Sequence, residues 1–160
     1  MSDDAYFPSI FGVGHRGQER AARNAPPVFL TSSDWQLLYE KAERVRYSAD
    51  EIILEKGSQR RAILIVDKGK VRVEQTEGVV VAEHGPRTVL GEMSFLGSTD
   101  ASASIIAAND TEMLIVEETY VYGLMVSVPG FATRFYQTLA VTLAHRLREA
   151  SDEIARLNNQ

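Results

Sequence analysis

Between Arg44 and Glu117 the chain consists of short apolar or alternating runs, each of which ends at a turn signal. The candidate strands are Arg44–Tyr47, Glu51–Glu55, Ala62–Val66, Lys70–Gln75, Val79–Glu83, Ser102–Ala107 and Met113–Val116. The breaks between them include Gly57-Ser58, Glu77-Gly78 and Asn109-Asp110. Short strands at this spacing, separated by glycine turns, are typical of an antiparallel sandwich or jelly roll. The sequence therefore predicts a mainly β domain.

Helical patterns flank this β region on both sides. Side chains in residues 31–34 can accept hydrogen bonds from the free N–H groups of a first turn, which predicts a helix that ends near Ala42. Its apolar face consists of Trp35, Leu38 and Tyr39. After the strands, residues 118–127 form a second predicted helix, which Pro129-Gly130 ends. A long third helix then runs from Phe131 to about Leu157.

The long C-terminal helix carries an apolar seam at heptad spacing. The seam residues are Tyr136, Ala140, Leu143, Leu147, Ala150, Ile154 and Leu157. Steps that alternate between four and three residues keep one narrow stripe on one side of a helix and favour pairing with a second copy. The alternative is a helix that only covers the β core, which explains Phe131 and Phe135 but does not reach Ile154 or Leu157. We therefore expect a homodimer formed through this helix.

Composition bounds the class of protein. A length of 160 residues favours one domain, and 44% hydrophobic residues suffice for a core. A formal charge of -5 disfavours a general binder of nucleic-acid phosphates, and the absence of cysteine excludes disulfides and thiolate chemistry. The acidic start has no secretory pattern, and the longest aliphatic run, Ala62–Val66, cannot cross a bilayer. These features predict a cytoplasmic protein with no membrane span.

The chain is expected to divide into three parts. Residues 1–27 contain several glycines and prolines and little apolar periodicity, which predicts a flexible lead-in. Residues 28–130 hold the β region with its flanking helices, and residues 131–160 form the long dimerisation helix. Within the β region, Gly91–Gly97 is an irregular insert, predicted to be a strand end that continues into a short helical turn, where a small ligand could meet backbone N–H groups.

Several stretches resemble the cyclic-nucleotide-binding domain family. They are Glu55-Lys56-Gly57, the Gly69 turn before Lys70–Val73, Leu90–Leu96, and, in the long helix, Leu143–Leu147 with Ser151. The resemblance covers roughly Phe29 to Leu157, and the helix is similar to that of the catabolite activator proteins. It implies a double-stranded β-helix jelly roll with flanking helices, which binds an anionic ribose cyclic phosphate in a phosphate-binding cassette.

The resemblance also implies roles for individual residues. Gly91 lets the backbone approach the sugar, and Glu92 accepts a hydrogen bond from the ribose 2′-hydroxyl. Met93 and Ser94 continue the cassette, and Ser102 occupies the place of a hydroxyl that donates to the phosphate. Ser151 matches a residue that reaches the base from the partner's helix, although Ala150 replaces the threonine that precedes it in that relative.

One position departs from the family pattern. Ala101 stands where the family has an arginine that pairs with the phosphate, and Asp100 stands beside it where many relatives have proline. Loss of one member of a buried ion pair costs about 3–5 kcal/mol. At about 1.4 kcal/mol per decade, cyclic AMP binding would weaken by two or more orders of magnitude. Arg87, on the loop before the cassette, is the best replacement cation, ahead of Arg60 and Arg61. The alternative for each arginine is a solvated surface position.

Other chemistries have little support. The histidines His15, His84 and His145 are scattered, so no metal site is expected. The sequence has no nucleophile elbow and no P-loop, so we predict no catalysis. Because the chain stops at Gln160, three residues past the seam, no recognition helix follows and direct DNA binding is not expected.

These observations predict a non-catalytic regulatory module that senses a small anionic nucleotide, such as cyclic AMP or cyclic GMP, or docks an unidentified protein partner. Ligand binding would act by shifting a population of conformations. One alternative is a ligand-free dimeric scaffold whose cassette is filled by its own side chains, such as Phe95 or Met93. Another is a cyclic di-GMP receptor, since Arg16 and Arg20 resemble the arginine pair of PilZ-type proteins.

Overall fold

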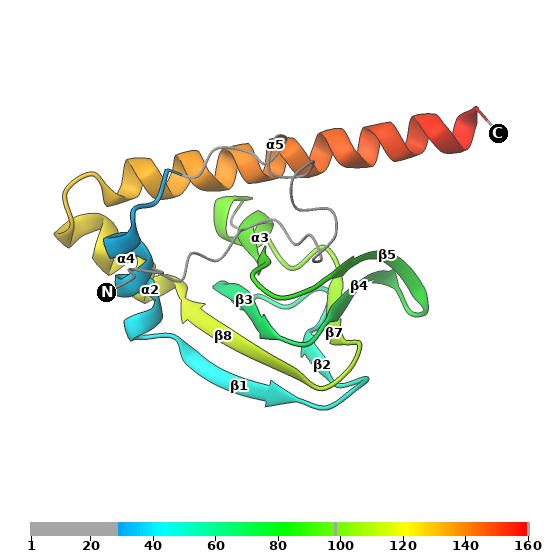
Figure 1. The fold of residues 1–160 in the computed structure, drawn as a ribbon, viewed down its shortest axis with the longest axis horizontal. Helices are drawn as coiled ribbons and strands as arrows, with labels where there is room; N and C mark the ends of the chain where they lie inside the picture. Colours follow the sequence, from blue (N-terminus) through cyan, green and yellow to red (C-terminus); the bar gives the residue numbers. More distant parts are fainter. Residues whose placement is uncertain (1–28, 98, 160) are drawn as a thin grey trace, which may run out of the picture.

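The computed structural model describes residues 29–97 and 99–159. Its elements are α2 (Ser32–Glu40), β1 (Glu43–Tyr47), β2 (Ile52–Leu54), β3 (Ala62–Lys68), β4 (Val71–Thr76), β5 (Val79–His84), β6 (Val89–Leu90), α3 (Glu92–Gly97), β7 (Ser104–Ala107), β8 (Thr111–Glu117), α4 (Glu118–Ser127) and α5 (Phe131–Asn158). The strands form two four-stranded sheets, with the orders β1-β8-β3-β6 and β2-β7-β4-β5. Helix α5 crosses one side of these sheets, and its C-terminal part projects beyond them (Figure 1).

The central strands β3 and β8 are covered on both faces. They pair antiparallel, with Ile63 opposite Val116 and Leu64 opposite Ile115. Leu64 and Ile115 face the interior of the roll, whereas Ile63 and Val116 belong to the core beneath the helices. A strand that is buried on both faces needs an unbroken apolar run, which accounts for the aliphatic sequence Ala62–Val66.

A capping interaction connects α2 with α5. The Asp34 amide donates to Thr31 Oγ1 at 3.2 Å, and the Thr31 amide donates to Asp34 Oδ2 at 2.9 Å. Arg134 of α5 donates to both oxygens of Asp34, at 2.7 and 2.8 Å. The hydrogen bond from Arg134 is the main reason that the pKa of Asp34 lies below its ordinary value. The residue that begins α2 therefore also fixes its position against α5.

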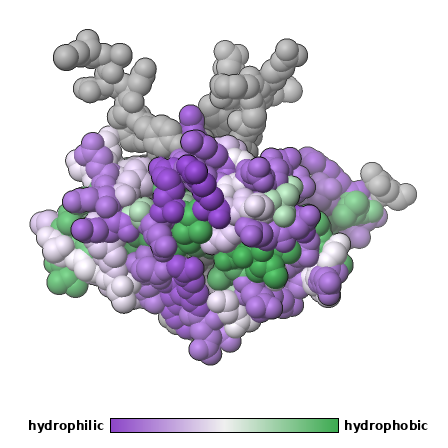
Figure 2. Space-filling view, turned by 90° about the horizontal axis from the view of Figure 1, so that it is seen from below, coloured by the Kyte–Doolittle hydropathy of each residue, from purple (hydrophilic) through white to green (hydrophobic). Residues whose placement is uncertain are grey.

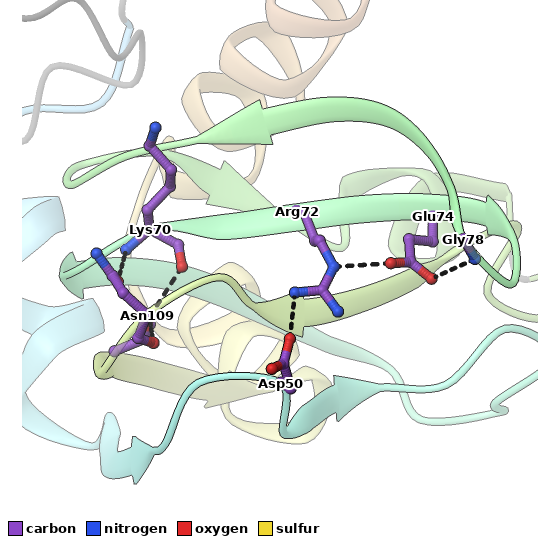
Figure 3. A network of polar contacts seen from close by, with 7 residues as sticks. Asp50, Lys70, Arg72, Glu74, Gly78 and Asn109 are labelled. Carbon is purple, nitrogen blue, oxygen red and sulfur yellow. Dashed lines mark hydrogen bonds and ion pairs between the residues drawn. The ribbon is translucent and has the colours of Figure 1, made fainter.

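Polar networks brace the outside of the roll. Arg72 of β4 donates to Asp50 at 2.8 Å and to Glu74 at 2.7 Å, and Glu74 accepts from the Gly78 amide at 3.2 Å (Figure 3). This network joins the turn before β2 to the hairpin between β4 and β5. On the face seen in Figure 2, hydrophilic residues surround separate hydrophobic patches.

The predicted fold is confirmed, with differences at the ends of elements. Helix α2 ends at Glu40 and not near Ala42, because β1 begins at Glu43. The predicted strand Ser102–Ala107 begins only at Ser104. The predicted helical turn in the insert is α3. The lead-in 1–27 lies outside the described residues. Within the part that is described, no helix is long and apolar enough to span a membrane.

Candidate functional site

The cassette begins at Gly91, which only glycine can occupy without a rearrangement. Its φ angle is +86°, and a Cβ atom there would lie 2.4 Å from the carbonyl oxygen of Ala62. A side chain would therefore push the cassette away from β3. Helix α3 starts at the next residue, and the Phe95 amide donates to the Gly91 carbonyl at 3.1 Å.

Glu92, predicted to contact a ribose, is buried between the roll and the long helix. It is 4% exposed, and one carboxylate oxygen accepts a hydrogen bond from Nη1 of Arg146 on α5. Nη2 of the same arginine donates to the Val89 carbonyl at 2.6 Å. Arg146 thus connects the beginning of the cassette with α5 through a charge-assisted contact. In the sequence, Arg146 belongs to a stretch that resembles the family, and nothing close to it along the chain marks Glu92 as its partner.

A cavity of about 20 Å³ lies beside Glu92, on the helix side of the sheet. Its wall consists mainly of apolar residues, and Thr138 and Thr142 of α5 also line it. A space of this size has room for about one water molecule and is far too small for a nucleotide. The cavity is therefore not the nucleotide cradle that the resemblance implies, which is inside the roll.

His84, at the end of β5, is a neighbour of Arg146 that sequence analysis did not assign to the site. Burial first, and then the positive charge of Arg146, lower the pKa of His84 to about 4. The imidazole is therefore neutral at neutral pH, with one nitrogen able to donate and the other able to accept a hydrogen bond. His84 was missed because it belongs to no motif and because Arg146, whose charge acts on it, lies far along the chain on α5.

Ala101 lies inside the apolar core of the roll. It is 6% exposed and packs in a cluster that includes Ile53, Leu90 and Ile105. Its backbone is fixed on both sides, since its amide donates to the Ser58 carbonyl at 2.9 Å and its carbonyl accepts from the Gly57 amide at 2.8 Å. A methyl group in an apolar cluster thus occupies the position at which the family resemblance implies a phosphate-binding arginine.

The three arginines considered as replacements have different surroundings. Arg60 pairs with Glu117 at the surface. Arg61 donates to the carbonyls of Ser94 and Thr99, at 3.0 and 3.5 Å, and so supports the cassette backbone. The amide of Arg87 donates to the Val66 carbonyl at 2.7 Å. Val66 is four residues along β3 from Ala62, and four residues of a strand span about 13 Å. A ligand role for Arg87 stays a prediction.

The other predicted site residues are divided between the core and the surface. Ser94 is buried, whereas Ser102 is exposed. Ser151 is exposed on α5, where its hydroxyl donates to the Leu147 carbonyl at 2.9 Å. Their contacts with a ligand stay predictions. Arg16 and Arg20 lie outside the described residues.

The side chains expected to fill a ligand-free cassette do not do so. Met93 is 57% exposed. Phe95 is buried, but it packs under the helices, with its ring centroid 5.3 Å from that of Phe135 and 5.5 Å from that of Tyr122. This expectation was wrong because the first turns of α3 direct Phe95 to the helix side and Met93 to solvent. The apolar cluster in the interior of the roll includes Ala101 and neither Met93 nor Phe95.

Helix α5 has two apolar stripes with opposite burial. Phe131, Phe135 and Leu139 are at most 4% exposed and pack in the core. The seam residues Leu147, Ile154 and Leu157 are 69%, 59% and 61% exposed. The distal half of α5 therefore presents a heptad seam that nothing in the described part of the chain covers.

The described residues also contain no group of three or more histidine, aspartate or glutamate side chains placed to hold a metal ion.

Comparison with known proteins agrees with this geometry. Residues 44–127, more than half of the chain, match the sequence model of the cyclic nucleotide-binding domain. The chain belongs to this family. It is 33% identical over 134 residues to the Cyclic AMP receptor protein of Thermus thermophilus, covering 80% of this chain and 60% of that protein. It is 26% identical over 137 residues to Cyclic GMP-binding protein C of Dictyostelium discoideum, covering 78% of this chain and 5% of that protein.

Among solved structures, the cyclic nucleotide-binding fold of this chain is similar to the catabolite activator protein of Thermus thermophilus. The TM-score is 0.64 at 32% identity, and the match covers 81% of this chain and 61% of that chain. The chain thus spans less than two thirds of the length of the curated relatives it matches.

Proposed function

We propose that this protein is a non-catalytic regulatory module in which the state of the cassette is transmitted to α5, and that it works as a homodimer through the α5 seam. The observation that carries the proposal is the contact of Arg146 with Glu92 and Val89. It joins the residue expected to contact a ribose with the helix expected to form the dimer.

The chemistry of Glu92 supports such a coupling. An ionised carboxylate is only an acceptor, and Arg146 already donates to one of its oxygens. A ligand hydroxyl that donates to Glu92 must share it with Arg146 or displace the guanidinium. Occupation of the cassette and the position of α5 are then linked, because each changes the free energy of the other.

The ligand class we favour is a cyclic nucleotide, in line with the names of the relatives, a cyclic AMP receptor protein and a cyclic GMP-binding protein. Ala101 determines the affinity that we expect for a cyclic nucleotide. Without the arginine, binding should be at least about 100-fold weaker than micromolar, since 3 kcal/mol or more is lost.

The homodimer rests on the α5 seam. Leucine and isoleucine residues that are 59% to 69% exposed at heptad positions lose this exposure when two helices pair. Two copies of α5 that pack along the seam would place the Arg146 contacts of both protomers beside one interface. A cassette change could then alter the interface itself.

Calorimetric titration tests the ligand class. Cyclic AMP, cyclic GMP and cyclic di-GMP are titrated into the full chain and into Ala101→Arg, with Ala101→Met as a control for side-chain bulk. We expect weak binding of a cyclic mononucleotide to the natural chain and an affinity gain of at least about 100-fold in Ala101→Arg only. No heat from any nucleotide at millimolar concentration, with either protein, would overturn the proposal. Binding of cyclic di-GMP alone would favour the Arg16 and Arg20 alternative.

A second candidate is a dimeric interaction module that needs no ligand. The burial of Ala101 in the apolar cluster of the roll favours it, because a methyl group at this position offers no charge to a phosphate. It predicts that the dimer binds its partner equally well with and without nucleotide. The same Ala101→Arg titration separates the two candidates, because a gain of affinity requires an otherwise functional cradle.

A further inference from the structure

We propose that Arg61 is a positioning residue that connects the C-terminal end of the cassette helix α3 with the start of α4. This inference rests on the proposed function, because it adds a second connection between cassette and helices. The first connection, from Arg146 to Glu92, holds the N-terminal end of α3 to α5. The second would hold the opposite end of α3 to α4.

The backbone of Arg61 is fixed at the junction of β8 and α4. Ala62, the next residue, pairs with Glu117 in the ladder between β3 and β8. The amide of Glu118, the first residue of α4, donates to the Arg61 carbonyl at 3.1 Å. Any movement of Arg61 is therefore also a movement relative to the start of α4.

The side chain of Arg61 extends from this junction to the cassette. Nη1 lies 3.0 Å from the Ser94 carbonyl and 3.5 Å from the Thr99 carbonyl, and Nε lies 4.0 Å from Oε2 of Glu118. The Arg61 and Glu118 side chains are only 25% and 21% exposed, so solvent screens the contact less than at an open surface.

The hydrogen bond from Arg61 supplies a donor to a backbone carbonyl of α3. Ser94 is among the last four residues of this six-residue helix, whose carbonyls have no partner within the helix. A cation is favourable at a helix C-terminus, and the rigid fork of a guanidinium can serve a carbonyl and a carboxylate together. Lysine offers a compact charge without this fork.

A second set of contacts, through Tyr122, also connects α3 with α4. Glu118 also accepts a hydrogen bond from Tyr122 one turn along α4, which is the first cause of the raised pKa of Tyr122. The ring of Tyr122 lies 5.5 Å from that of Phe95 on α3. A continuous series of contacts thus leads from Ser94 through Arg61, Glu118 and Tyr122 back to Phe95 of α3. A displacement of the cassette would have to move α4 or break one of these contacts.

Amide hydrogen exchange on the full, ligand-free chain tests the connection. In Arg61→Met we expect exchange to rise at least about 5-fold in both α3 and α4, while amides of β1 and β8 keep their rates. Arg61→Lys should keep α4 protected through its charge next to Glu118 and lose protection only in α3. The matched control is Arg60→Met, which removes a neighbouring arginine paired with Glu117 at the surface and should change neither helix.

Coupling distinguishes positioning from simple packing. If Arg61 acts through Glu118, the double variant Arg61→Met/Glu118→Gln should exchange in α4 no faster than either single variant. Increases that multiply, or an Arg61→Met effect confined to α3, would overturn the proposal. So would a uniform rise across the whole chain. If Arg61→Met does not fold, amide exchange in α3 and α4 is compared between Arg61→Lys and Glu118→Gln, and this comparison tests the same coupling.

The ligand arm keeps this proposal separate from the proposed function. In the Ala101→Arg background, cyclic AMP should slow exchange in α4, and the additional Arg61→Lys change should reduce this response at least about 3-fold while the dissociation constant stays within about 3-fold. If cyclic AMP does not bind but the ligand-free coupling is found, the proposed function fails and the Arg61 connection stands. The reverse pattern overturns only the Arg61 connection.

Discussion

Arg146 of α5 donates through Nη1 to the carboxylate of Glu92, while its Nη2 donates to the Val89 carbonyl at 2.6 Å. The two donors bind the last strand before the cassette and the first residue of α3. One guanidinium thus holds the bend at Gly91 from the side of the long helix. The side chain of Glu92 is 5% exposed and that of Arg146 is 24% exposed.

Arg146→Met should destabilise the protein, because it leaves the carboxylate of Glu92 buried without its partner. We expect the free energy of unfolding to fall by about 3 kcal/mol, the lower end for a buried pair, since Arg146 keeps some solvent contact. Denaturant unfolding measures the change. Arg148→Met, two residues along the same helix and exposed, is the control and should change stability by less than about 0.5 kcal/mol. Equal losses in both variants would contradict the assigned contact.

Gly91→Ala should cost more than an alanine at another glycine with positive φ. At Gly91 the new methyl meets the Ala62 carbonyl at 2.4 Å, whereas at Gly57, with φ +84°, it meets nothing within 4 Å. We expect a loss of about 1 kcal/mol for Gly57→Ala, from backbone strain alone, and about 3 kcal/mol for Gly91→Ala. Thermal or denaturant unfolding provides the comparison. A smaller loss at Gly91 would mean that β6 and β3 can separate easily.

Leu147→Glu should convert the proposed dimer into monomers. Leu147 is 69% exposed in one chain, and pairing along the seam would place two new carboxylates in an apolar interface. Sedimentation velocity of the full chain reports the mass. Arg148→Glu adds the same carboxylate one residue away, outside the seam, and should remain dimeric. A natural chain that sediments as a monomer at micromolar concentration would refute the seam.

Acid should destabilise the fold through His84. Its pKa is about 4 in the folded chain and 6.5 for an ordinary histidine, so between these values the unfolded chain binds more protons. The free energy of unfolding should therefore decrease as pH falls from about 6.5 to 4, by up to about 3 kcal/mol from this residue. His84→Leu should flatten this part of the stability profile. An unchanged slope in that variant would show that His84 is not buried beside Arg146.

Much of the architecture could be predicted from local patterns. The alternation of short apolar runs and glycine turns predicted a jelly roll, because strand faces follow a period of two residues. Proline and glycine at 129 and 130 marked the boundary between α4 and α5. The heptad seam likewise predicted the side of α5 that none of the residues described by the structure covers. Each of these features depends only on residues a few positions apart.

The connections around the cassette could not be predicted in this way. Arg61, His84 and Arg146 resembled ordinary polar positions, because their partners lie on elements far away in sequence. A carboxylate such as Glu92 can be matched to a motif from the residues next to it in sequence. Its partner Arg146, however, is determined by how α5 packs across β6. Local sequence patterns were enough to predict the strands and the helices, and to suggest that Ala101 stands in place of an arginine. The charges that meet could be identified only in the folded chain, because packing, and not spacing along the chain, sets the burial and the distances of remote side chains.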